Sequence, residues 1–182
     1  VMIAVDTGVR HSLSDGWYKD LPRVAREAAQ SLGVALLAEA DASRLSAAEG
    51  TLPDPHARVA KHVVGETGRV GAFVRAMEQR DLRVMGDLVF ASHESLRDVL
   101  GVSWPAADAA VHAARCAGAL GARMIGAGRG GSVLALAHPG DAGRVRAAMI
   151  GALGRGEDDP LGFEVAPGRG AGWAAIEAHV GP

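Results

Sequence analysis

Glycine is concentrated in one stretch of this 182-residue chain, Gly121–Leu136, where it separates two short apolar segments. Gly126, Gly128, Gly130 and Gly131 stand close together in its centre. A backbone with so little side chain can approach another group closely and adopt positive φ, at an entropic cost that a simple connection does not require. The pattern predicts a loop shaped to hold another group, and the alternative is a plain tight connection.

Three other side chains are of types that could do chemistry. His93 is a possible general acid or base, but no partner is evident from the sequence, so we expect a hydrogen-bonded structural histidine. Tyr18 follows Trp17, and such a tyrosine either contacts a ligand or anchors the start of a helix. Cys116 is the only cysteine and lies among alanines in a predicted helix, so we expect a small buried residue rather than a nucleophile.

The histidines and carboxylates do not predict a metal site. His56 and His62 are six positions apart, which does not place them on one helical face. The others considered lack neighbouring ligands at metal spacing: His112, His138 and His179. We interpret four acidic residues as caps, turns or solvated charges: Asp6, Asp15, Glu66 and Asp158.

The elements that must position these residues follow from hydrophobic periodicity and from glycine and proline. Strands are predicted at Met2–Val5, Ala122–Ile125, Val133–Ala137 and Phe163–Val165, with the middle two as an antiparallel pair. Helices are predicted from about Asp20 to Leu32, with Pro22 near the start, and over Ala42–Ala48, Arg58–Arg80, Leu82–Leu96, from Pro105 to about Gly118, and Gly140–Leu153. Asp81 is the expected N-cap of the fourth of these helices.

The helix over Arg58–Arg80 has an apolar stripe at helical spacing, formed by Val70, Phe73, Val74 and Met77, which we expect to face inward. Strands at both ends, a central hairpin and intervening helices predict an α+β fold. Its antiparallel sheet of about four strands is packed with helices in a split βαβ, ferredoxin-like arrangement.

Composition limits the classes of function. Hydrophobic residues make up 48% of the chain and the formal net charge is -2, which favours neither a nucleic-acid nor a membrane partner. No apolar run approaches the roughly 20 residues that cross a bilayer, and the single cysteine fits a reducing compartment, so we expect a cytoplasmic protein. Because Val1 leads directly into an apolar strand, we expect the chain to be a piece of a longer protein.

Five separated segments resemble, in order and spacing, the C-terminal half of the galactokinase family, within the GHMP kinase superfamily. The resemblance covers nearly the whole chain. The segments are Val5–Tyr18 (VDTGVRHSLSDGWY), Ala91–Asp98 (ASHESLRD), Val102–Asp108 (VSWPAAD), Gly121–Leu136 and Ala166–Trp173 (APGRGAGW).

The resemblance implies phosphorylation of the anomeric hydroxyl of galactose, with ATP and Mg²⁺ as cofactors. It implies that the Tyr18 hydroxyl binds the sugar. It also implies that the loop with Gly126, Gly128, Gly130 and Gly131 packs beside the phosphate-binding loop. This chain departs from the family pattern in the loop, where Ile125 replaces a threonine, Ala127 a glycine and Arg129 an aromatic residue.

The main catalytic parts of the family do not match any segment here, namely the serine-rich phosphate loop, the sugar-binding Arg and Glu-His-Asp motif and the catalytic aspartate. We therefore expect residues 1–182 to be a GHMP kinase C-terminal domain without catalytic residues and without the N-terminal domain that binds ATP. The isolated chain is expected to be inactive.

Three alternatives stay open. The chain could belong to a non-catalytic galactose sensor or regulator derived from a galactokinase. It could belong to another GHMP sugar kinase, for example one acting on N-acetylgalactosamine. It could also be a module that pairs with a separately encoded N-terminal half or with itself, because splitting a two-lobed enzyme uncovers apolar surface.

Overall fold

Four short strands pair into one antiparallel sheet in the computed structural model, which describes residues 1–10, 16–156 and 159–168. The strands are β1 (Met2–Asp6), β2 (Gly121–Met124), β3 (Ser132–Leu136) and β4 (Gly162–Val165). Their order across the sheet is β2-β3-β1-β4, and the register pairs Val5 with Val133 and Ala4 with Phe163. All four predicted strands are confirmed, including the antiparallel pairing of β2 with β3.

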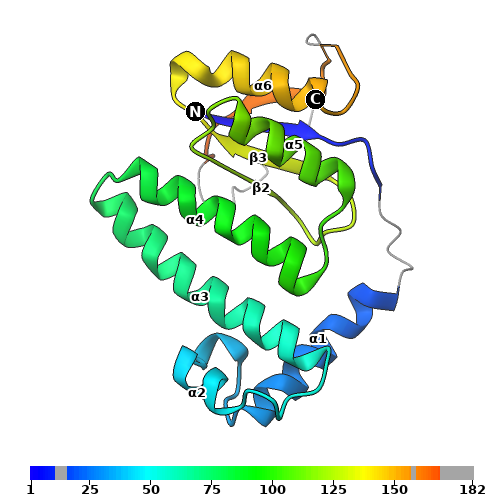
Figure 1. The fold of residues 1–182 in the computed structure, drawn as a ribbon, viewed down its shortest axis with the longest axis vertical. Helices are drawn as coiled ribbons and strands as arrows, with labels where there is room; N and C mark the ends of the chain where they lie inside the picture. The colour runs from blue at the N-terminus through cyan, green and yellow to red at the C-terminus, as the bar shows by residue number, and fades with distance from the viewer. Residues whose placement is uncertain (11–15, 157–158, 169–182) are drawn as a thin grey trace, which may run out of the picture.

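The described helices are α1 (Gly16–Ser31), α2 (Ala42–Ala47), α3 (His56–Glu78), α4 (Leu82–Glu94), α5 (Pro105–Cys116) and α6 (Ala142–Gly151). Shorter turns are η1 (Leu37–Glu39), the π-helix η2 (Ser95–Leu100) and η3 (Pro139–Asp141). Figure 1 shows α5 and α6 against the sheet, α4 beside β2, and α3 with α1 and α2 farther away. The sheet with α5 and α6 has the predicted ferredoxin-like arrangement. Within the described ranges, no helix is long and apolar enough to cross a membrane.

The core lies on the face of the sheet that α5 and α6 cover. Side chains on that face of the strands are fully buried, and they are Ile3, Val5, Ala122, Met124, Val133 and Ala135. Burying one large apolar side chain contributes about 1.5–3 kcal/mol, so Ile3, Val5, Met124 and Val133 each stabilise the packing of the sheet against these helices. On the opposite face, Phe163 is 51% exposed.

Two glycines let α4 lie directly against β2. A methyl group at Gly121 would come within 2.6 Å of the Gly86 carbonyl oxygen, and a methyl at Gly86 would overlap the Leu120 carbonyl. Any side chain at either position would therefore push the helix away from the strand. Because β2 is an edge strand, α4 also covers an edge that would otherwise be open to pairing with another chain.

The helix predictions are confirmed, with two differences at α1. This helix begins at Gly16 rather than near Asp20, so Pro22 lies inside it and not in its first turn. Packing of Val24 and Ala28 in the core outweighs the backbone hydrogen bond that proline lacks. The predicted N-cap of α4 is confirmed, since the Asp81 carboxylate accepts a hydrogen bond from the Val84 N–H at 3.0 Å.

The inward stripe predicted on α3 is wrong at three of its four positions, and only Phe73 is half-buried. Val70 is 62% exposed, Met77 is 52% exposed, and Val74 is also exposed. Helices α1 and α4 pack against α3, but no described element covers the side of α3 that carries these three residues. Periodicity identifies an apolar face of a helix and does not reveal whether a neighbour is present to cover it.

We expect Gly86→Ala to lower the free energy of unfolding by about 2 kcal/mol or more, because the methyl group meets backbone that no side-chain rotation can move. The matched control is Gly68→Ala in α3, where nothing lies within 4 Å of the new methyl group. There, the higher helix propensity of alanine should raise stability by up to about 1 kcal/mol. Urea unfolding measures both, and equal effects would contradict the close approach of α4 to β2.

Candidate functional site

The glycine loop, residues 125–131, joins β2 to β3 with a backbone that turns repeatedly into the left-handed region. The φ angles are 86° at Gly126, 95° at Gly128 and 110° at Gly131. Arg129, which carries a Cβ, has a φ of 60°. Such angles are unfavourable for residues other than glycine, so the shape of this loop requires its glycines.

The middle of the glycine loop rests on Val102, which lies between η2 and α5. The Arg129 N–H donates a hydrogen bond to the Val102 carbonyl at 2.8 Å. A methyl group at Gly128 would lie 2.6 Å from that same oxygen. The loop is therefore packed on one side, whereas Gly126 and Ala127 are exposed.

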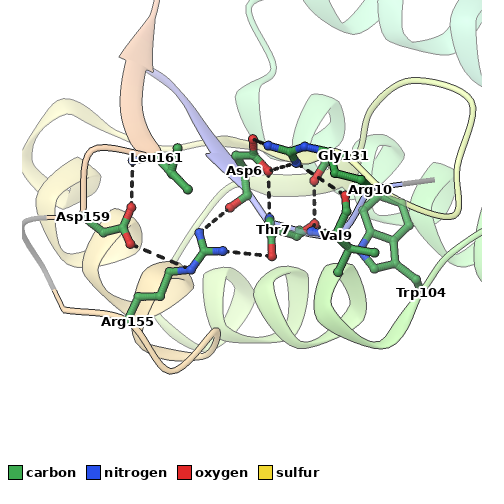
Figure 2. A network of polar contacts seen from close by, with 10 residues as sticks. Asp6, Thr7, Val9, Arg10, Trp104, Gly131, Arg155, Asp159 and Leu161 are labelled. Atoms are coloured by element: carbon green, nitrogen blue, oxygen red, sulfur yellow. Dashed lines mark hydrogen bonds and ion pairs between the residues drawn. The ribbon is translucent and has the colours of Figure 1, made fainter. Parts of the chain in front are cut away.

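Thr7 connects the end of the glycine loop to the start of α5 (Figure 2). Its N–H and its hydroxyl both donate to the Gly131 carbonyl, at 3.0 and 2.6 Å, and its Oγ1 accepts the indole N–H of Trp104 at 3.2 Å. The Gly131 N–H donates in turn to the Val9 carbonyl at 2.9 Å. Thr7 and Trp104 are buried, so loss of the threonine hydroxyl would leave the Trp104 indole N–H without its partner, while the Gly131 carbonyl would keep the Thr7 N–H.

Asp6 and Arg155 fix the turn that follows β1 (Figure 2). Arg155 donates to the carbonyls of Asp6 and Thr7 at 2.9 and 3.2 Å. The Asp6 carboxylate accepts the Gly8 N–H and two nitrogens of Arg10, each at 2.8 Å. The hydrogen bond from Arg10 lowers the pKa of Asp6, which keeps the carboxylate ionised. The interpretation of Asp6 as a turn-stabilising residue is confirmed.

His93 is the hydrogen-bonded structural histidine that the sequence predicts. It is 1% exposed, and its two ring nitrogens contact the Asp108 carboxylate and the backbone N–H of Met124. Burial lowers the pKa of His93, and the nearby charge of Asp108 opposes this only in part. The imidazole is therefore neutral at neutral pH.

Four of the five sequence segments that carry the resemblance meet around the glycine loop. They contribute Thr7, His93, the Val102–Asp108 segment and the loop itself. The fifth segment is described only from Ala166 to Gly168, and it leaves the sheet beside Met2, at the opposite end of β1. Its Gly170 and Gly172 lie outside the described residues.

The sugar-binding prediction falls on Tyr18, which belongs to α1. Its side chain lies outside the described part of the structure, as do Asp15 and Asp158, so these interpretations stay predictions. The glycine loop has one charged residue, Arg129, and no group that would accept a proton. The loop can therefore line a binding site, but a residue outside the loop must accept any proton that the reaction releases.

Two interpretations of individual residues are wrong. Cys116 is exposed near the end of α5, rather than a buried filler. Glu66 is not a solvated charge, because it accepts hydrogen bonds from Ser92 at 2.7 Å and from Arg69. Burial would raise the pKa of Glu66, but these two hydrogen bonds together lower it.

The sequence did not single out Thr7, Trp104 and Asp108 as connecting residues. Trp104 and Thr7 are 97 positions apart, and no local pattern links them. The only sequence signal for these three residues was that they lie in segments that resemble the galactokinase family. In the described part of the chain, no group of three or more His, Cys, Asp or Glu could hold a metal ion.

Comparison with known proteins identifies this arrangement. Residues 73–155 match the model of the family described as GHMP kinases C terminal. The galactokinase of Streptomyces coelicolor is 37% identical over 173 residues, which are 93% of this chain and 45% of that protein. The galactokinase of Mycobacterium tuberculosis is 39% identical over 163 residues, covering 88% of this chain and 44% of that protein. The chain thus spans less than half the length of these curated relatives.

Solved structures agree with the fold. Lactococcus lactis galactokinase complexed with galactose superposes with a TM-score of 0.77 at 28% identity, over 84% of this chain and 41% of that chain. Leishmania major mevalonate kinase, in complex with R-mevalonate, has a TM-score of 0.55 at 24% identity and shares the fold alone. The chain contains a GHMP kinase C-terminal domain and is a homologue of the C-terminal part of galactokinases.

We expect Gly128→Ala to lower the free energy of unfolding by about 2–4 kcal/mol, because it combines an unfavourable φ with a clash against Val102. The matched control is Gly126→Ala, which has a similar φ but no atom within 4 Å of the methyl group, and should cost about 1 kcal/mol. Equal losses in urea unfolding would show that the loop does not rest on Val102.

Proposed function

We propose that this chain is the C-terminal portion of a galactokinase, which transfers the γ-phosphoryl group of ATP to the anomeric hydroxyl of galactose. The observation that supports this most strongly is its identity of 37% to a galactokinase over 93% of the chain. The fit to a galactokinase solved with galactose adds to it. We further propose that residues 1–182 form one GHMP kinase C-terminal domain, that the complete protein is cytosolic, and that this portion alone is inactive.

In this reaction the hydroxyl oxygen bonds to Pγ, the bond from Pγ to the β–γ bridging oxygen breaks, and the hydroxyl proton passes to a base. Positioning and charge neutralisation supply most of the catalysis in phosphoryl transfer. We assign to the glycine loop a role as one wall of the active site beside the phosphates, held from behind by Val102 and Thr7. The exposed Gly126 and Ala127 offer backbone there without bulky side chains.

The chain supplies only part of the cofactor sites. The loop backbone fits contact with the ATP phosphates, since glycine permits close approach. Mg²⁺ in kinases usually keeps several waters and is held by one or two carboxylates together with the phosphate oxygens of the nucleotide. The glycine loop carries no carboxylate, and in the described part of the chain no group of three or more His, Cys, Asp or Glu could hold a metal ion. We therefore assign the base and the Mg²⁺ ligands to the remainder of the complete protein.

The surface supports packing against a further lobe. Large apolar side chains are exposed at two separate places: Phe163 on β4, at the edge of the sheet opposite β2, and Val70, Val74 and Met77 on α3. Because residues three and four apart share one face of a helix, the three on α3 form one apolar surface, and such surfaces commonly mark interaction sites. Because galactokinase relatives are more than twice as long as the matched region, we assign this surface to the N-terminal half.

The galactokinase proposal predicts that the complete protein, meaning this chain with any coding sequence that precedes it, converts galactose and ATP into galactose 1-phosphate and ADP. Coupled ADP release and ³¹P NMR measure the reaction, and the 182-residue chain alone is the inactive control. Faster turnover of N-acetylgalactosamine than of galactose would assign the complete protein to another kind of GHMP sugar kinase. Turnover of neither sugar would contradict the proposal.

For Tyr18 we expect Tyr18→Phe in the complete protein to raise KM for galactose about three- to tenfold, the effect of losing one hydrogen bond to a neutral hydroxyl. KM for ATP should not change. Trp17→Phe is the neighbouring control and should leave both values near those of the wild type. An unchanged KM for galactose in Tyr18→Phe would show that the Tyr18 hydroxyl does not bind the sugar.

A second candidate function is a galactose sensor without kinase activity. The altered loop favours it, because Ile125 is partly exposed where the family has a threonine hydroxyl, and Arg129 adds a charge. Isothermal titration calorimetry distinguishes the two functions. Galactose binding by the complete protein without ATP turnover would support the sensor.

A further inference from the structure

His93 lies where α4 covers the outer edge of β2. Its Nδ1 lies 3.3 Å from the Met124 backbone nitrogen, and its Nε2 lies 3.1 Å from Asp108 Oδ1. A backbone N–H can only donate, so Nδ1 must carry the lone pair and Nε2 the proton. This tautomer satisfies both partners, whereas a doubly protonated ring would place two N–H groups against each other at Met124.

The two hydrogen-bond partners of His93, Met124 and Asp108, are each connected to the glycine loop, but at different points. Met124 is the last residue of β2 and directly precedes the loop. Asp108 also accepts the Ser103 hydroxyl at 2.6 Å, and Ser103 follows Val102, whose carbonyl holds the loop at Arg129. One buried imidazole therefore links the entry of the loop to the segment on which its middle rests.

We propose that His93, in its neutral Nε2–H form, is a positioning residue for the glycine loop. It holds β2 and the Val102–Asp108 segment in a fixed relation, and the loop keeps its shape because both of its supports are fixed. A role in catalysis rests on the proposed function, since the loop matters for turnover only if it lines the active site. The structural part of the proposal does not depend on it.

The charges around His93 set its response to pH. Asp108 on α5 favours the protonated ring, while Arg97 on η2 and Arg123 on β2 disfavour it; Asp98 also lies near enough to interact. Burial is the largest influence and lowers the pKa of His93 below its ordinary value of about 6.5. Unfolding thus releases a histidine that binds protons more readily, so this contribution to stability is complete above about pH 6.5 and is lost as the pH falls.

The test uses the 182-residue chain and needs no catalysis. Nitrogen-15 NMR of the His93 imidazole should show a protonated Nε2 and an unprotonated Nδ1 at pH 7.5. His93→Gln retains a donor near Nε2 but leaves the Met124 amide without an acceptor. It should speed hydrogen exchange of the Met124 and Arg129 amides about tenfold. His93→Asn, whose Oδ1 takes the place of Nδ1, should restore most of the protection at Met124.

His62→Gln is the matched control. His62 is also buried, but its Nδ1 contacts Ser95 on η2 rather than Met124 or Asp108, so its loss should leave both amides protected. A protonated Nδ1 in the wild type, or equal exchange in the His62 and His93 variants, would overturn the proposal. If His93→Gln does not fold, hydrogen exchange of the wild-type chain at low pH replaces the variant. Protonation of His93 without faster exchange of the Met124 amide would also overturn the proposal.

In the complete protein, the catalytic role predicts that His93→Gln lowers kcat or raises KM for ATP, with His62→Gln again as control. Changed exchange with unchanged kinetics would retain the positioning role and refute only its link to turnover. If the complete protein phosphorylates no sugar, the exchange and tautomer measurements still decide the positioning role.

Discussion

The direct contact of α4 with β2 is the constraint on which the site depends. Gly86 and Gly121 let two backbones touch. From there, seven helical residues rise about 10.5 Å and three strand residues about 10 Å, so the helix and strand advance together. This equal advance brings His93 beside Met124, where the glycine loop begins. A wider spacing between α4 and β2 at Gly86 and Gly121 would break the hydrogen bond from the Met124 N–H to His93.

The glycine loop gains its shape from buried groups behind it rather than from contacts within itself. Val102 and Thr7 hold its middle and its end by hydrogen bonds, and Trp104 holds Thr7. Binding sites need groups whose positions are fixed in advance, because ordering a loose loop on binding costs affinity. The glycine loop carries little side-chain bulk and is held by buried residues, as its proposed role beside the ATP phosphates requires.

Much of the fold was predictable from the sequence, because local apolar periodicity reports strands and helices directly. The glycine loop was also predictable from local sequence, because a backbone with positive φ favours glycine. The exposed Val70 and Met77 were mispredicted because a pattern cannot show whether a neighbour covers it. The partners Thr7 and Trp104 were beyond sequence reasoning, because a hydrogen bond between distant residues leaves no local trace.

The most direct test of the proposed role of the glycine loop and Tyr18 is a crystal structure of the complete protein with galactose and a non-hydrolysable ATP analogue. We expect residues 125–131 to lie against the phosphates with the same backbone conformation as in this structure, and the Tyr18 hydroxyl to bind the sugar. A glycine loop remote from both ligands, or a sugar bound without Tyr18, would contradict the assignment of this site.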